Sequence, residues 1–162
     1  MAIKFAKAMG AEVTLFTRSE AKIDEAKRNG ADHVVISTDD DQMKQAAGSL
    51  RYILDTVSVE HDFNPYVGCL GVDGTYVLLG QLTPVSPPLE AMPLIFGRRA
   101  ILGSVIGGIP ETQEVLDFCA EHNISCDVEM LDIRDIGEAY ERMKRGDVRY
   151  RFVIDMASLK DA

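Results

Sequence analysis

The chain opens with Met1-Ala2-Ile3-Lys4-Phe5-Ala6-Lys7-Ala8-Met9-Gly10, a segment that predicts a helix. An apolar strand, Glu12-Val13-Thr14-Leu15-Phe16, follows at once and ends in the polar tip Thr17-Arg18-Ser19-Glu20-Ala21-Lys22. A helix, a strand and a polar tip in this order form the second half of a βαβ unit, so we expect the first strand and its Gly-rich turn to precede residue 1. Because such a turn cradles a pyrophosphate at a helix N-terminus, the sequence predicts a nucleotide-binding architecture without the segment that holds the nucleotide most tightly.

Apolar strands alternate with helices up to residue 105. Strands are predicted at 33–36, 51–57, 75–80 and 100–105, and helices at 19–29, 39–47, 62–70 and 94–96. Ser19 is expected to cap its helix, and Asp73-Gly74 to form a turn before the next strand. This alternation predicts an α/β fold, a doubly wound and mostly parallel sheet covered by helices on both faces.

The pattern changes after Gly107-Gly108. Helices are predicted at 110–122 and 133–145, and strands at 127–131 and 150–156. We therefore predict a nucleotide-binding domain over residues 1–108 and a C-terminal α+β segment over residues 109–162.

Composition excludes several classes of partner. The net charge of −9 argues against a nucleic-acid or anionic-membrane surface, since both attract basic patches. No apolar run approaches the ~20 residues needed to span a bilayer, and no signal-peptide pattern is present. Cys69, Cys119 and Cys126 are too irregular for a disulfide framework, which favours free thiols in a reducing cytoplasm. The three histidines show no metal-ligand spacing, so we predict no metal site.

Several motifs carry a family resemblance. They are the opening segment, Gly30-Ala31-Asp32, Asp55-Thr56-Val57-Ser58 and Gly146-Asp147-Val148-Arg149-Tyr150-Arg151-Phe152. Over essentially its whole length the chain resembles the C-terminal part of a zinc-dependent medium-chain alcohol dehydrogenase of the cinnamyl alcohol dehydrogenase type. The resemblance implies a truncated Rossmann-type fold lacking its first strand. It also implies a zinc-binding catalytic domain whose metal ligands have no match here, so no catalytic or metal-ligating residue is predicted.

The polar tip of the first strand predicts the coenzyme. NAD-preferring Rossmann domains place an acid there for the ribose 2′-hydroxyl. This tip instead offers Thr17, Arg18, Ser19 and Lys22, with Glu20 as its only acid. Cations, hydroxyls and a helix N-terminus suit a 2′-phosphate, which favours NADP(H). The alternative is a solvated helix cap with incidental basic residues.

Further coenzyme contacts are expected at the ends of later strands. The resemblance implies backbone contacts from Thr56 and Val57 near the ribose, against the alternative of a plain strand end with Asp55 capping a turn. Gly80 would let the coenzyme approach the backbone closely, although a simple turn glycine would look the same.

The resemblance also implies that the segment Ser104-Val105-Ile106 holds the nicotinamide carboxamide. It further implies that Arg151 reaches the coenzyme, against the alternative of a surface arginine on an edge strand. Ser104, Ile106 and Arg151 complete the predicted site.

The implied activity is reversible hydride transfer between NADP(H) and an alcohol–aldehyde pair, with the chain alone inactive. The alternative is a non-catalytic nucleotide-binding or dimerisation module, with a homodimer formed through the edge strand from Phe96 to Val105. A flavodoxin-like regulatory domain is disfavoured by the C-terminal motifs. Because the missing strand would lie between two inner strands, we expect a sheet that is split, closed up or filled by another chain, and lower stability than a complete domain.

Overall fold

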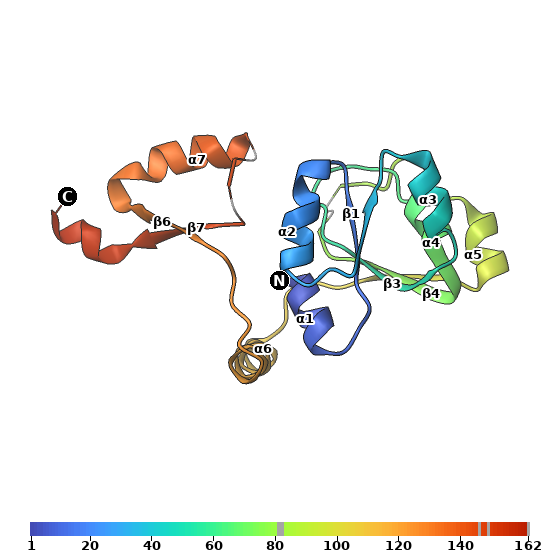
Figure 1. Ribbon diagram of the computed structural model, residues 1–162, viewed down its shortest axis with the longest axis horizontal. Coiled ribbons are helices and arrows are strands. Elements are labelled where there is room, and N and C mark those ends of the chain that lie inside the picture. The colour runs from blue at the N-terminus through green and yellow to red at the C-terminus, as the bar shows by residue number, and fades with distance from the viewer. Residues whose placement is uncertain (81–82, 146, 149, 162) are drawn as a thin grey trace. The chain divides into compact units, whose positions relative to one another are not determined.

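The computed structural model describes residues 1–80, 83–145, 147–148 and 150–161 (Figure 1). The chain divides into two compact units, Ala2–Leu116 and Asp117–Ala162, with Met1 grouped with the second. The division falls within helix α6 (Ile109–Glu121). The domain boundary at residue 108 remains a prediction.

In the first unit, helices and strands alternate as predicted. The elements are α1 (Ala2–Ala8), β1 (Thr14–Thr17), η1 (Glu20–Lys22), α2 (Ile23–Arg28), β2 (His33–Ile36), α3 (Asp40–Ala46), β3 (Leu50–Asp55), α4 (Asn64–Cys69), β4 (Leu70–Leu78), α5 (Ala91–Gly97) and β5 (Ala100–Gly103). Every strand pair described is parallel. The α/β fold class is therefore confirmed.

The strands of this unit form two separate sheets. One is β1-β2 and the other is β3-β4-β5, and among the described residues no ladder joins β1 to β3. Of the outcomes expected for a sheet without its first strand, the split sheet is the one observed. Both sheets share one core, because Phe16 on β1 and Val35 on β2 pack against the buried cluster that contains Ile53 and Tyr76.

The buried core lies between the three-stranded sheet and its helices. Its most deeply buried side chains are Tyr76, Phe63, Leu70, Val67 and Cys69. Helices α3, α4 and α5 lie on the same side of this sheet (Figure 1). The predicted cover of both faces is incomplete here, because side chains of the opposite face, those of Tyr52, Leu54 and Leu102, are exposed.

Two local predictions about helix and strand starts need correction. Ser19 occupies the predicted N-cap position with an extended backbone, but it begins the short helix η1, which leads into α2 at Ile23, and its side chain makes no capping hydrogen bond. Asp39 shows the expected chemistry instead, since its Oδ1 accepts hydrogen bonds from the backbone N–H groups of Asp41 at 2.9 Å and Gln42 at 3.1 Å. The hydrogen bonds from Gln42, and to a smaller extent the one from Asp41, hold the pKa of the Asp39 carboxyl below its usual value.

The predicted turn at Asp73-Gly74 lies inside strand β4. This strand begins at Leu70, which is paired with Leu50, and its register shifts before Thr75 pairs with Tyr52. Asp73 has a φ of 61°, the left-handed conformation that the dipeptide favours. The turn signal therefore marks an irregularity within the strand and not its beginning.

The second unit contains the C-terminal elements. They are β6 (Glu129–Asp132), η2 (Ile133–Asp135), α7 (Ile136–Lys144), β7 (Phe152–Asp155) and η3 (Met156–Asp161), and β6 pairs with β7. Gly146, which follows the predicted helix 133–145, lies outside the described residues, and η3 was not predicted.

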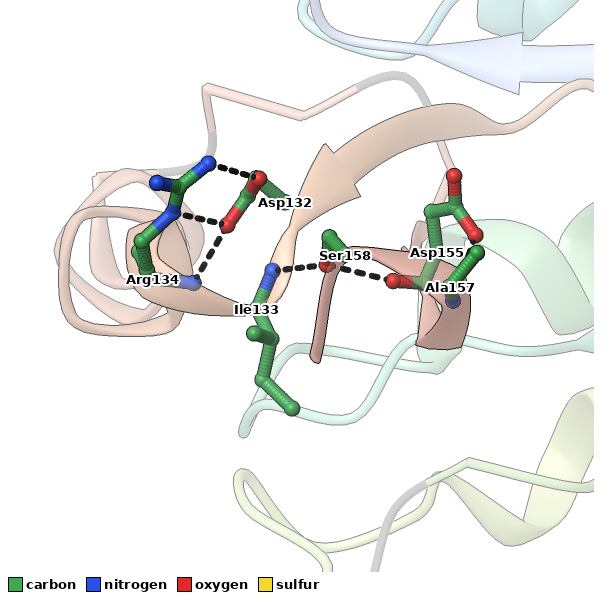
Figure 2. A network of polar contacts seen from close by, with 6 residues as sticks. All are labelled: Asp132, Ile133, Arg134, Asp155, Ala157 and Ser158. Atoms are coloured by element: carbon green, nitrogen blue, oxygen red, sulfur yellow. Dashed lines mark hydrogen bonds and ion pairs between the residues drawn. The ribbon is translucent and has the colours of Figure 1, made fainter. Parts of the chain in front are cut away.

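Polar contacts join the two short helices of this unit (Figure 2). Ser158 Oγ accepts a hydrogen bond from the backbone N–H of Ile133 at 3.0 Å and donates one to the carbonyl oxygen of Asp155 at 2.5 Å. The Asp132 carboxylate accepts from Arg134 through the backbone N–H and the guanidinium. The hydrogen bond between Ile133 and Ser158 thus connects η3 with η2, directly after β6.

Candidate functional site

Three parallel strands end side by side and define one edge of the sheet. Asp55 on β3, Leu78 on β4 and Gly103 on β5 are in register. The backbone N–H of Gly80 donates to the carbonyl oxygen of Asp55 at 3.2 Å, and that of Ser104 donates to Leu78 at 3.0 Å. In open α/β sheets, ligands bind outside the carboxyl ends of the strands. The structure therefore brings three predicted site positions, Thr56, Gly80 and Ser104, to this edge.

A buried carboxylate organises the edge. Asp55 is 5% exposed, and its Oδ1 accepts a hydrogen bond from the backbone N–H of Val57 at 2.9 Å. Its Oδ2 accepts from the hydroxyl of Tyr76 at 3.1 Å and lies 3.2 Å from Nε2 of His61. The bond to Val57 is the turn-capping role that the alternative interpretation gave to Asp55. Sequence reasoning missed the two side-chain partners, because neither has a spacing that points to Asp55.

The hydroxyl of Tyr76 is held protonated. Burial raises the pKa of Tyr76 far above its usual range, and the charge of Asp55 adds to the rise. Tyr76 therefore acts as a hydrogen-bond donor to Asp55 and not as an acid–base group.

The neighbouring backbone leaves no room for a side chain at Gly80. A Cβ at this position would lie 2.6 Å from the carbonyl oxygen of Thr56 and 2.7 Å from that of Val57. The close approach seen at Gly80 is to the segment after β3, and the approach of a coenzyme to Gly80 stays a prediction.

The polar corner after β1 carries cations without a described partner. The backbone N–H of Ser19 donates to Thr17 Oγ1 at 3.2 Å, which shapes the turn. Arg18, Ser19 and Lys22 are exposed, and within the described part of the chain neither Arg18 nor Lys22 has an ion-pair partner. Free cations beside hydroxyl groups match the chemistry of a phosphate ligand.

An aromatic path links this corner to the segment after β3. The ring of Phe16, next to Thr17, makes an edge contact with Tyr66 at a centroid distance of 5.3 Å. Tyr66 in turn lies 6.1 Å from the ring of His61. The two parts of the candidate site therefore rest on one packed support.

The remaining predicted residues are less constrained. Ser104 and Ile106 follow β5 and are exposed, Ile106 at 90%. Arg151 is exposed before β7 in the second unit. Their roles toward a coenzyme stay predictions.

The parallel strands, with the predicted site positions at their carboxyl ends, define a Rossmann-type α/β protein. Residues 1–121 match the family model described as zinc-binding dehydrogenase, and the chain belongs to this family. The resemblance stated from the sequence is therefore confirmed.

Individual relatives agree with this assignment. Aldehyde reductase YahK of Escherichia coli K12 is 54% identical over 162 residues, covering 99% of this chain and 46% of the relative. Cinnamyl alcohol dehydrogenase SbCAD4 from Sorghum bicolor superposes with a TM-score of 0.90 at 41% identity, covering 97% of this chain and 44% of that one. CAD from Helicobacter pylori, complexed with NADP(H), gives 0.81 at 37% identity, with coverage of 97% and 44%. The chain thus spans less than half the length of these relatives.

The zinc implied by the family does not fit the residues described here. Across residues 1–80, 83–145, 147–148 and 150–161, no three His, Cys, Asp or Glu side chains are grouped to hold a metal ion. The same residues include no helix with the length and apolarity that crossing a membrane requires.

Proposed function

We propose that this chain supplies the NADP(H)-binding part of a zinc-dependent alcohol dehydrogenase that interconverts alcohols and aldehydes. The coenzyme carries the hydride in such a reaction. The residues of this chain bind and orient the coenzyme. Because the described residues offer no zinc ligand set, we expect no alcohol oxidation by the 162-residue chain alone. The free cysteines support a cytoplasmic location.

The observation that carries the proposal is the corner after β1. Arg18 and Lys22 are exposed cations without a described ion-pair partner, and the Ser19 hydroxyl is not used as a helix cap. Glu20 is the only acid among these residues, so a 2′-phosphate meets net positive charge. The complex of the Helicobacter pylori relative with NADP(H) supports the same coenzyme.

The remaining contacts are proposed at the strand ends. Thr56 and Val57 would offer backbone groups near the ribose, and Gly80 keeps their segment in place. Ser104 and Ile106 would lie beside the nicotinamide carboxamide.

Fluorescence titration with NADPH and NADH tests the coenzyme assignment. Arg18→Ala should weaken NADPH binding about tenfold or more, since a hydrogen bond to a charged group contributes about 1.5–3 kcal/mol. NADH binding should be nearly unchanged, because NADH lacks the 2′-phosphate. The matched control is Arg28→Ala, which removes an exposed arginine in the last turn of α2. Equal loss for both coenzymes, or no NADPH binding by the unaltered chain, would contradict the proposal.

One observation favours a second function, assembly into a homodimer. Strand β5 is at the end of its sheet, and Ile95, Phe96 and Leu102 beside or within it are exposed. An apolar edge strand is suited to pairing with a second copy. Light scattering should then give twice the monomer mass, and Leu102→Lys should return the monomer. A monomer at all concentrations would remove this alternative.

A further inference from the structure

The ring of His61 lies between two groups that only accept hydrogen bonds. Its Nδ1 is 2.9 Å from the carbonyl oxygen of Val59, and its Nε2 is 3.2 Å from Oδ2 of Asp55. A carbonyl and a carboxylate oxygen have no proton to donate. Nδ1 therefore donates to the Val59 carbonyl oxygen, and Nε2 lies within ion-pair distance of the buried Asp55 carboxylate.

The pair is enclosed. The His61 side chain is 19% exposed and that of Asp55 is 3% exposed. The ring packs edge-on against Phe63 at 4.8 Å and against Tyr66 on α4 at 6.1 Å. The titratable groups facing the pair are thus Tyr66 from α4 and Tyr76 from β4, while Asp55 itself comes from β3. Charge interactions in such a site are screened little by water.

These contacts connect several parts of the segment that follows β3. Asp55 binds the N–H of Val57, His61 binds Asp55, and His61 also binds the carbonyl oxygen of Val59. The carbonyl oxygens of Thr56 and Val57, in the same segment, lie close to Gly80. The His61 side chain therefore contacts both Asp55 at the start of the segment and Val59 within it.

We propose that His61 is a positioning residue whose ring, held against Asp55 and the Val59 carbonyl oxygen, fixes the segment 55–61 in the shape that receives the coenzyme ribose. This proposal rests on the proposed function. His61 touches no reacting atom, and its effect reaches the coenzyme through the backbone of Thr56 and Val57.

The test compares three variants of the full chain. His61→Phe keeps an aromatic ring against Phe63 and removes both ring nitrogens, whereas His61→Gln keeps one donating group. The control is His33→Phe, which alters an exposed histidine paired with Glu12 at 2.7 Å. His61→Phe should weaken NADPH binding about tenfold or more, His61→Gln should lose less, and His33→Phe should bind as the unaltered chain does.

The conservative variant separates positioning from mere packing. His61→Phe keeps the aromatic packing against Phe63, so a role in packing alone predicts unchanged NADPH affinity. Equal affinities of His61→Phe and the unaltered chain, or a loss in His61→Gln as large as that in His61→Phe, would overturn the proposal.

One readout without coenzyme keeps this proposal separate from the proposed function. The Val57 amide should exchange with solvent faster in His61→Phe than in the unaltered chain, whereas His33→Phe should leave this exchange unchanged. If NADPH fails to bind but this result holds, the proposed function fails and the role of His61 in fixing the segment stands. Unchanged Val57 exchange in His61→Phe would refute that role.

Discussion

Gly80 lies directly against Thr56: a Cβ at position 80 would be 2.6 Å from the Thr56 carbonyl oxygen. Real Cβ atoms do not approach backbone so closely, and the neighbour here is backbone that cannot rotate away. Gly80→Ala should therefore displace the segment after β3 and destabilise the chain by about 1–3 kcal/mol. Urea unfolding gives the free energy, and NADPH titration should show weaker binding.

The matched control is Gly103→Ala on the neighbouring strand β5. A Cβ there would meet no atom within 4 Å, so stability should be unchanged or slightly higher. If both alanine variants unfold at the same urea concentration, the close approach at Gly80 has no energetic importance.

Burial of Leu70 predicts a large effect on stability. Its side chain is 0% exposed at the junction of α4 and β4, within the core that contains Val67 and Phe63. Leu70→Ala should lower the free energy of unfolding by about 2–5 kcal/mol, because it leaves a cavity. Leu54→Ala on β3 removes the same atoms from a side chain that is 50% exposed and should cost much less. Similar midpoints for the two variants in urea would contradict the described core.

Much of the fold could be predicted from local signals. Strand β2 was predicted with its observed bounds, because a short apolar run lies between a helix-ending glycine and the acids that start the next helix. Helix α6 differed by one residue at each end. These elements depend on periodicity and capping, which neighbouring residues determine.

Two of the wrong or missing parts depend on tertiary contacts. The start of β4 at Leu70 is fixed by pairing with Leu50, while the local sequence Asp73-Gly74 signals a turn. His61 acquires its role only because the fold places it against Asp55. Neither relationship leaves a periodic pattern in the sequence, so local reasoning could not find them.

The split sheet predicts a pattern of amide hydrogen exchange. Strand β4 pairs on both sides, whereas β3 pairs with β4 alone among the described strands. In a parallel strand with one neighbour, only alternate amides have a ladder partner. Thr75–Leu78 should thus be protected at every residue, and β3 at every second residue. Continuous protection along β3 would show that another strand pairs with its free edge.

The ion pair between Asp132 and Arg134 predicts that the stability of the fold changes with pH only under acidic conditions. The guanidinium of Arg134, 2.6 Å away, and then its backbone N–H lower the pKa of Asp132 from 3.8 to about 2. A lowered pKa in the folded state stabilises the fold above about pH 4, and this contribution is lost as the pH falls from about 4 to about 2. Arg134→Gln should move the carboxyl carbon titration of Asp132 back toward 3.8. Lys144→Gln, which breaks only the exposed pair with Glu141, should leave that titration in place. A titration of Asp132 near 3.8 in the unaltered chain would show that the ion pair does not form.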